Sequence, residues 1–421
     1  MNILVVGGGG REHAIIKKLR ENKDVEKIYA LPGNGGIARD AECYPVKATD
    51  IDGIVEFARK MRPDYAVVAP DDPLAMGCVD ALTSIGIPCF GPEAKAAVIE
   101  SSKVFSKNLM KKYGIPTARY HTFDEIQDAL YYLESAPIPT VIKADGLALG
   151  KGVIIAETRA DAFKAVREMM EDHKFGKSGE KIVIEEFLKG PEVSVLSFTD
   201  GKTVVPMISS MDHKRAGDGD TGLNTGGMGT IAPNPYYTEE IAARCMEEIF
   251  LPTMRAMNAE GRKFKGCLYF GLMITADGPK VIEYNCRFGD PETQVVLPLL
   301  ESDLLTIMQA VTEERLDEVE VKWNKGSACC VVAASDGYPV SYEKGYEISI
   351  DEEVWPNVFV AGAVEEDGKL LTSGGRVLGV TAVKPTLAEA IESSYEMLDK
   401  IEFGNKYYRV DIGQRALKAL K

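Results

Sequence analysis

The chain has few of the residues that staple small or metal-dependent proteins together. Its 421 residues include 8 cysteines and 4 histidines, and no two cysteines form a C-x-x-C pair. This spacing predicts neither a zinc site nor a disulfide framework, and it favours a reducing, cytoplasmic context.

Long hydrophobic runs and a surplus of basic residues are also lacking. No apolar run approaches the ~20 residues that span a bilayer, and Met1 leads into an apolar strand pattern without a basic, cleavable leader. The 49 basic and 64 acidic residues give a net charge of −15, whereas broad binding to nucleic acid requires a basic surface. We therefore expect a cytoplasmic protein without membrane or nucleic-acid partners, although a local basic pocket could still hold a small anion.

What is present is an ordinary globular composition, with 45% hydrophobic and 27% charged residues. A chain of this length exceeds one core, so we expect two to four structural units. The first hundred residues alternate strand and helix patterns, as in ILVV (3–6), KIYAL (27–31) and YAVVAP (65–70), with a helix across 73–84. This alternation predicts a parallel, doubly wound α/β unit with helices on both faces.

The rest of the chain divides into a larger middle part and a separate end. A Lys-rich helix over 102–113 precedes a segment of about 124–189 that has the size of a small α+β lobe. Further strands follow, with a long polar loop over 209–235 and a helix near 238–258. From about 324, short strands punctuated by Gly and Asp indicate another unit.

Glycines follow the first strand in GGGGREH (7–13). A helix that begins there would direct backbone N–H groups and the positive end of its dipole at an anion. The dinucleotide fingerprint G-x-G-x-x-G would place its third glycine at Glu12 or His13, which argues against NAD. A single bound phosphate and a purely structural turn are the two alternatives. PGNGG (32–36), after the second strand, brings another loop to the same edge of the sheet.

The stretch KADGLALGKGV (143–153) differs from a P-loop. Only three residues separate Gly146 from Gly150, Gly152 follows Lys151, and the loop joins two strand patterns. It is either a Gly-rich cover for a triphosphate, since glycine lets backbone N–H groups approach oxygens, or an ordinary solvated hairpin.

Two polar segments lie further along the chain. VIEEFLKGPE (183–192) could present backbone groups to an adenine edge and a carboxylate to a ribose, although acidic strand ends are common. SMDHKRAGDGDTGLNTGGMG (210–229) contains six glycines, and loops of this length are usually functional or disordered. Its DHKR cluster could read an anionic, hydroxylated ligand.

The stretch VIEYNCRFGDPETQ (281–294) combines a strand with an unusual number of polar residues. Glu283 and Asn285 would share one face of the strand, roughly 7 Å apart at the backbone. Two such oxygen donors could hold a hard cation, with the fixed charge of Arg287 two residues on. A solvated strand face with a polar turn is the alternative.

Taken in order, these motifs resemble the phosphoribosylamine–glycine ligase family of the ATP-grasp superfamily. The similarity runs from GGGGREH through SGGRVLGVTA (373–382), and RFGDPETQ (287–294) is its most specific part. The resemblance implies ATP-dependent ligation of glycine to 5-phosphoribosylamine in purine biosynthesis. The products are glycinamide ribonucleotide, ADP and phosphate, the intermediate is glycyl phosphate, and Mg²⁺ or Mn²⁺ assists.

The same resemblance implies a fold and a state of assembly. We expect an N-terminal parallel α/β domain like that of biotin carboxylase (1–101) and an ATP-grasp domain (102–323) with a mobile lobe at about 124–189. A β-rich C-terminal domain (324–421) completes a monomer.

The family's functional residues carry over to matching positions of this sequence. The residues implied for ATP are Lys103, Lys143, Gly146, Lys151, Gly152, Glu185, Glu186, Leu188 and Glu192. Those implied for the two substrates are Gly9, Gly10, Asn34, Asp212, His213, Lys214, Arg215, Arg287 and Asp290. Arg287, Lys143 and Asp290 are the implied catalytic residues, and Glu283 and Asn285 the implied metal ligands.

Some positions depart from the family pattern, and other functions compete. Leu272 and Met273 stand where related enzymes carry a first metal-binding acid, so the number of metal ions stays open. Another ATP-grasp ligase of the purine pathway, a carboxylase or a formyltransferase, is the nearest alternative, and RFGDPETQ and DHKR weigh against it. Biotin carboxylase is disfavoured because the chain has no Met-Lys-Met acceptor. A non-catalytic nucleotide-binding module would be expected to lack the lysines and metal ligands that are present.

Overall fold

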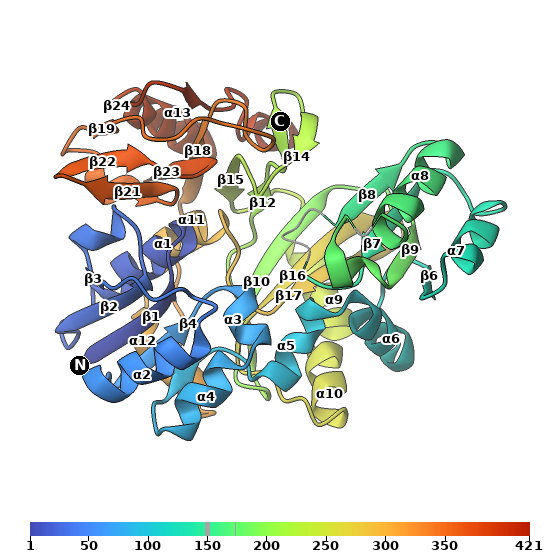
Figure 1. Cartoon of the computed structure of the whole chain (residues 1–421), viewed down its shortest axis with the longest axis horizontal. Helices are drawn as coiled ribbons and strands as arrows, with labels where there is room; N and C mark the ends of the chain where they lie inside the picture. The colour runs from blue at the N-terminus through green and yellow to red at the C-terminus, as the bar shows by residue number, and fades with distance from the viewer. Residues whose placement is uncertain (148–151, 173) are drawn as a thin grey trace.

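A five-stranded parallel sheet organises the N-terminal part of the chain. Residues 1–147, 152–172 and 174–421 are described by the computed structural model (Figure 1). Leu4 and Val6 pack into the core on one side of this sheet, and Ile3 and Val5 into the core on the other. The expected doubly wound unit is thereby confirmed. The strand order is β3-β2-β1-β4-β5, with β1 Asn2–Gly7, β2 Lys27–Pro32, β3 Glu42–Cys43, β4 Tyr65–Val68 and β5 Cys89–Phe90.

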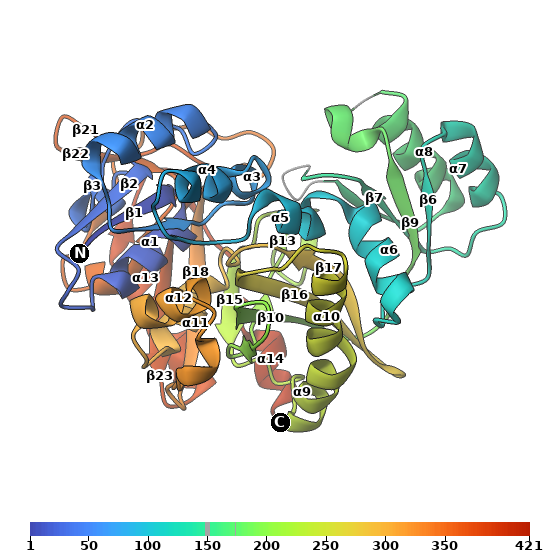
Figure 2. The same cartoon turned by 90° about the horizontal axis from the view of Figure 1, so that it is seen from below.

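Helices cover both faces of this sheet (Figures 1 and 2). The Asp50 carboxylate caps α2 by accepting a hydrogen bond of 3.0 Å from the Gly53 N–H. The single helix expected across 73–84 is wrong, because Gly77 adopts a left-handed conformation with φ of 85° and separates α3 from α4. The helices are α1 Gly10–Leu19, α2 Ile51–Met61, α3 Asp71–Ala75, α4 Cys78–Ser84 and α5 Ala94–Ser101.

The middle of the chain contains two antiparallel sheets, and helix α6, Lys103–Tyr113, precedes both in the sequence. Ser102 caps this helix, and Gly114, in the left-handed region, ends it. One sheet has the order β6-β9-β7-β8 and, with helices α7 and α8, forms a lobe that projects at the right of Figure 1. Its elements are β6 Tyr120–Phe123, α7 Ile126–Leu133, β7 Thr140–Ala144, β8 Val153–Ala156, α8 Arg159–Met170 and β9 Ile182–Glu186.

The second middle sheet, β11-β10-β16-β17, lies beside this lobe. The helix expected near 238–258 is present as α9, a π-helical turn over Met246–Phe250 and α10. The elements are β10 Glu192–Thr199, β11 Val204–Pro206, α9 Glu239–Cys245, α10 Leu251–Ala259, β16 Gly266–Thr275, β17 Gly278–Asn285, α11 Thr293–Val296 and α12 Leu304–Thr312.

The C-terminal sheet includes strands from far earlier in the chain. The segment 209–235, expected to be a long polar loop, contains four short strands, and two of them join the order β12-β15-β18-β23-β20. Met228 and Ile231 are buried there, so a few apolar residues anchor an otherwise polar stretch. The four strands are β12 Met211–Asp212, β13 Arg215–Gly217, β14 Thr221–Asn224 and β15 Gly229–Ala232.

Small elements complete the C-terminal unit, which lies above the N-terminal sheet in Figure 1. No helix in the described ranges is both long and apolar enough to cross a membrane. The remaining elements are β18 Ser327–Ser335, β19 Ser349–Ile350, β20 Val358–Val360, β21 Ala363–Glu366, β22 Lys369–Thr372, β23 Arg376–Lys384, α13 Leu387–Leu398, β24 Ile401–Glu402, β25 Lys406–Tyr407 and α14 Gln414–Ala419.

Candidate active site

Strand β17 presents two oxygen-bearing side chains on one face. Glu283 lies opposite Gly271 and Asn285 opposite Tyr269 of β16, whereas Tyr284 between them is buried on the other side. The register shifts before Glu283, which leaves Ile282 as an extra residue in a β-bulge. Bulges commonly re-aim groups beside active sites. Here the Ile282 carbonyl accepts a hydrogen bond of 2.9 Å from Lys143 Nζ.

The donor set on this face fits a hard cation. Among the described residues the Glu283 carboxylate has no ion pair or hydrogen bond, and the Asn285 amide oxygen accepts only a 3.3 Å contact from Arg287. Magnesium prefers oxygen ligands and takes few from the protein. No cluster of three or more His, Cys, Asp or Glu suited to a metal occurs in the described ranges.

Two lysines converge beside this strand, of which Lys143 is buried and Lys103 is half-buried. Lys103 Nζ donates to the Gly146 carbonyl at 2.7 Å, and Lys143 Nζ lies 3.0 Å from Glu185 Oε1. Burial lowers the pKa of Lys103, Glu283 opposes this shift, and Lys143 adds to it. Since a desolvated cation interacts strongly with an anion, this region is suited to phosphate groups.

The segment after β9 carries the other residues expected at the nucleotide. Glu186 is turned outward, where its carboxylate accepts from the backbone and side chain of Arg119 at 2.9 and 2.8 Å. The strand ends at Glu186, so Leu188 lies in the following connection, and Glu192 opens β10 with an ion pair of 2.9 Å to Lys214. Lys151 lies outside the described residues.

Arg287 is held at the end of β17 by a buried acid. Its Nη2 lies 3.0 Å from Glu100 Oε1, and the other oxygen of Glu100 accepts from the Cys286 N–H at 2.7 Å. Arg287 Nε is buried without a hydrogen-bond partner in the described structure. The guanidinium is therefore fixed in place while one donor stays available.

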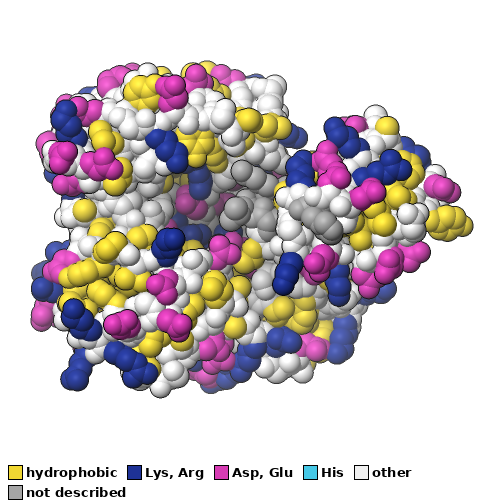
Figure 3. All heavy atoms as spheres, in the orientation of Figure 1, with side chains coloured by type: hydrophobic (Ala, Val, Ile, Leu, Met, Phe, Trp, Pro, Cys, Tyr) yellow, Lys and Arg dark blue, Asp and Glu magenta, His cyan; other side chains and the backbone are white. Residues whose placement is uncertain are grey.

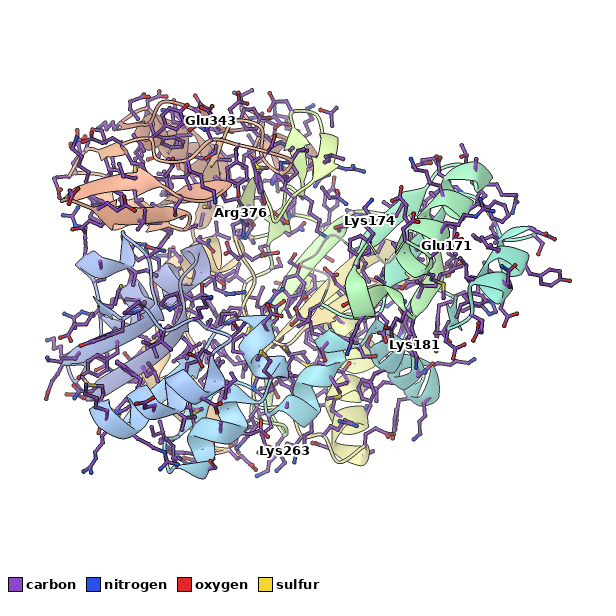
Figure 4. The ribbon with its side chains drawn as sticks, viewed as in Figure 1. Glu171, Lys174, Lys181, Lys263, Glu343 and Arg376 are labelled. Atoms are coloured by element: carbon purple, nitrogen blue, oxygen red, sulfur yellow. The ribbon has the colours of Figure 1, made fainter. Side chains whose placement is uncertain are left out.

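Asp290 links RFGDPETQ to the first glycine loop and to the C-terminal unit. Arg376 lies 3.3 Å from its carboxylate, and Gln294 donates to it at 2.8 Å. A Cβ at Gly9 would come within 3.5 Å of Asp290 Oδ2, so the two loops are neighbours. Burial alone would raise the pKa of Asp290, but Arg376, Arg11 and the Gln294 hydrogen bond together lower it. Figure 4 labels Arg376 where the C-terminal sheet faces the rest of the molecule.

A second acid lies close to these loops. Asp212 Oδ1 is buried without a partner among the described residues, beneath Gly227. Burial and the neighbouring charge of Glu292 raise the pKa of Asp212 well above its usual range. Glu292 itself accepts a hydrogen bond of 3.2 Å from the Tyr269 hydroxyl. Burial beside a second acid thus favours the protonated form of the Asp212 carboxyl group.

Viewed as a surface, the molecule is hollowed near its centre, between the C-terminal unit above and the N-terminal unit below, and Lys, Arg, Asp and Glu side chains lie inside the hollow (Figure 3).

Three family models match almost the whole chain. They are the N domain (residues 1–100), the ATP-grasp (A) domain (101–293) and the C domain (328–415) of phosphoribosylglycinamide synthetase. The chain belongs to the phosphoribosylglycinamide synthetase family. The family resemblance and fold class expected from the sequence are confirmed.

Relatives of this chain match it over nearly their full lengths. The chain is 48% identical over 414 residues to a phosphoribosylamine–glycine ligase of Clostridium acetobutylicum, which covers 98% of this chain and 100% of that protein. A ligase of the same name from Haemophilus influenzae is 46% identical, covering 99% of each.

Solved structures agree with this assignment. A crystal structure of phosphoribosylamine–glycine ligase from Thermotoga maritima superposes with a TM-score of 0.85 at 34% identity, covering 98% of this chain and 100% of that one. A biotin carboxylase–ATP-analogue complex from Campylobacter jejuni has a TM-score of 0.73 at 15% identity, covering 98% of each chain, which shows a shared fold.

Three residues expected at the substrates have side chains that bind other parts of the protein itself. His213 Nδ1 hydrogen-bonds the Gly229 carbonyl at 3.0 Å, and Nε2 accepts from the Gly413 N–H at 3.1 Å. The Asn34 amide donates to two backbone carbonyls, and Arg215 donates to that of Gly222. These side chains hold loops together, so any contact they make with a substrate would go through the backbone or require rearrangement.

The structure also brings in residues that the sequence did not single out. Glu292 stands inside the motif RFGDPETQ and Arg376 inside SGGRVLGVTA, so these motifs could have pointed to them. Lys107 lies one helical turn after Lys103, and this spacing could have indicated it. Glu100 and Tyr269 carry no local signal, because only tertiary folding places them against Arg287 and Glu292.

Proposed function

We propose that the protein ligates glycine to 5-phosphoribosylamine with ATP, giving glycinamide ribonucleotide, ADP and phosphate. The observation that carries this proposal is the meeting of Lys103, Lys143, the Glu283–Asn285 face and Arg287 around one strand, in a chain related along its whole length to enzymes named for this reaction.

The chemistry requires anions to be brought together. The glycine carboxylate attacks the γ-phosphorus of ATP, which releases ADP and forms glycyl phosphate. The amine of phosphoribosylamine then attacks the carbonyl carbon, and phosphate leaves. Both steps depend on positioning and on preorganised positive charge rather than on covalent catalysis by the protein.

Each group of residues supplies one part of this task. Lys103 and Lys143 hold the phosphates together with Gly146, Lys151 and Gly152, and Arg287 stabilises the transferring phosphoryl group. Glu283 and Asn285 would hold Mg²⁺ or Mn²⁺, which neutralises phosphate charge when bound. The backbone of 185–188, including Glu185, Glu186 and Leu188, receives adenine, and Glu192 receives the ribose.

The substrates lie on the side of the two glycine loops. Asp290 takes the glycine ammonium group, a role that its lowered pKa supports because it stays ionised. Gly9, Gly10 and the loops of Asn34 and 212–215 receive phosphoribosylamine, with Lys214 as the cation. We infer a cytoplasmic monomer with domains 1–101, 102–323 and 324–421 and a mobile lobe at about 124–189.

The decisive test is ADP release by the purified protein with Mg²⁺, omitting one substrate at a time. ADP should appear only when ATP, glycine and phosphoribosylamine are all present, and mass spectrometry should find glycinamide ribonucleotide. ADP release that persists without glycine, or that needs bicarbonate or formate instead, would favour another ATP-grasp ligase.

A matched pair of variants tests the metal face. Glu283→Gln should raise the Mg²⁺ concentration needed for half-maximal activity at least tenfold, because a carboxylate ligand is replaced by a neutral amide. Asp277 is an exposed acid (86% exposed) in the turn between β16 and β17. Asp277→Asn should leave the Mg²⁺ concentration for half-maximal activity unchanged.

A further inference from the structure

Lys107 is a buried cation to which the reaction so far gives no role. It lies on α6 one turn beyond Lys103 and is 2% exposed. Its Nζ donates to Thr117 Oγ1 at 2.7 Å, lies 3.2 Å from Glu185 Oε1 and faces the Tyr120 ring at 5.6 Å from the centroid. A hydroxyl, a carboxylate and an aromatic ring of the protein thus surround this ammonium group.

Glu185 is shared between two lysines. The same oxygen, Oε1, lies 3.2 Å from Lys107 and 3.0 Å from Lys143, and the residue is 4% exposed. A buried carboxylate beside a single lysine would neutralise that lysine. Beside two lysines, one carboxylate leaves a net charge of one positive unit. Burial lowers the pKa of Lys107 to about 8, while Glu185 opposes the shift, so Lys107 is charged at neutral pH.

Lys143 has capacity left for a ligand. One of its donors goes to the Ile282 carbonyl and another faces Glu185. The third donor has no hydrogen-bond partner in the described structure. Lys103 is close enough to feel the charges of both Lys143 and Glu283.

The two lysines also join the two middle sheets. Glu185 belongs to β9 of the projecting lobe, whereas Thr117 donates to the Val281 carbonyl of β17 at 2.7 Å, next to the Ile282 carbonyl bound by Lys143. Lys107 therefore connects the strand expected at adenine with the strand expected at the metal.

We propose that Lys107 is a positioning residue for nucleotide binding: by neutralising Glu185 it keeps the charge of Lys143 available to the phosphates of ATP. This rests on the proposed use of ATP but not on glycine or phosphoribosylamine. Without Lys107, Lys143 and Glu185 would form a closed pair, and the site would lose one net positive charge.

Binding of a non-hydrolysable ATP analogue with Mg²⁺, measured by isothermal titration calorimetry without other substrates, tests this inference. Lys107→Met should raise the Kd about tenfold, and Lys107→Arg should keep it within threefold of the parent. The double variant Lys107→Met/Glu185→Gln should recover to within threefold, because no carboxylate remains to capture Lys143. Lys112 lies on the same helix as Lys107. The matched control is Lys112→Met, which removes only an exposed ion pair with Glu260.

Parental affinity in Lys107→Met, or a double variant that binds as weakly as the single one, would overturn the proposal. If Lys107→Met does not fold, Lys107→Met/Glu185→Gln is compared with Glu185→Gln alone. Equal affinities support action through Glu185, and a tenfold weaker double variant overturns it. Steady-state kinetics add a second readout, since the KM for ATP should rise far more than that for glycine. Tight analogue binding by a protein that fails to ligate glycine would count against the proposed function alone.

Discussion

At the scale of single residues, the site depends on charges that are buried in pairs. Arg287 and Glu100 illustrate this, because the guanidinium is 19% and the carboxylate 7% exposed. Removing one member of a buried pair costs about 3–5 kcal/mol, since the other charge stays buried alone. A variant meant to test Arg287 in catalysis must therefore keep the charge.

We predict that Arg287→Lys lowers kcat at least a hundredfold and leaves the melting temperature within a few degrees of the parent. Lysine preserves the charge beside Glu100 but loses the planar fork with its spare Nε donor. Arg287→Ala should also lose activity, but its melting temperature should be much lower than that of the parent. The double variant Arg287→Ala/Glu100→Gln should regain part of the lost stability. Near-normal turnover in Arg287→Lys would remove Arg287 from phosphoryl transfer.

His213 should make stability sensitive to acid. Burial lowers its pKa to about 4, from an ordinary value of 6.5. Since the unfolded chain binds this proton below about pH 6.5 and the folded chain resists it until about pH 4, the contribution of His213 is complete above 6.5 and lost as pH falls towards 4.

We predict that the free energy of unfolding, measured by urea titration, falls by up to about 1.4 kcal/mol per pH unit in this window through His213. A His213→Asn variant should be less stable at pH 7 and show a shallower slope. An unchanged slope would show that other groups, among them His13 with its lowered pKa, govern acid sensitivity.

At the scale of elements, the β13–β14 hairpin is positioned by the end of the chain. Arg409, 1% exposed on its side chain, forms a bidentate pair with Asp411 at 2.8 and 2.9 Å and reaches Asp220 and the Arg215 carbonyl. The Tyr407 hydroxyl adds a bond to the Ala216 carbonyl. Residues 407–415 thus hold the hairpin that continues from the DHKR cluster.

We predict that Arg409→Met makes this hairpin accessible to trypsin at Lys214 and Arg215 and raises the KM for phosphoribosylamine more than that for ATP. The cause is the loss of the two hydrogen bonds from Arg409 to the hairpin, at the Arg215 carbonyl and Asp220, and of the Asp411 pair that orients the guanidinium. Arg415→Met removes only an exposed partner of Asp220 and serves as the control. Equal cleavage rates in the two variants would contradict this role of the C-terminal segment.

At the scale of the whole molecule, the body is tied together while the lobe stands apart. Lys17 donates to the Trp355 and Val358 carbonyls at 2.7 Å each, and Asn34 to the Val360 carbonyl at 2.8 Å, so the N-terminal and C-terminal units are cross-linked. The lobe has its own hydrophobic core, drawn from α7, α8, β7, β8 and β9. A separate core lets it move as one body.

We predict that Mg²⁺ with an ATP analogue reduces the radius of gyration measured by small-angle X-ray scattering. Lys143 Nζ already contacts the Ile282 carbonyl of β17, so phosphates bound there would draw the rest of the lobe towards this strand. Lys143→Met should show no such change at the same analogue concentration. An unchanged radius in the parent protein, under saturating analogue, would contradict lobe closure.

The sequence by itself determined the elements and motifs that rest on local physics. Alternation of strand and helix patterns identified the doubly wound sheet, and the period of two placed Glu283 and Asn285 on one face. Family motifs added the expected chemistry, because the residues of each motif stand close together in the sequence and can be recognised there.

Only the tertiary structure decided which distant groups meet. It placed β12 and β15 in the C-terminal sheet and gave Asp290 its partner Arg376. It also set Glu185 between two lysines and made His213 a hydrogen-bond partner of the backbone at Gly413. A buried charge or ring nitrogen takes its partner from whatever the fold brings within about 3 Å. That partner can lie hundreds of residues away, so no local pattern encodes it.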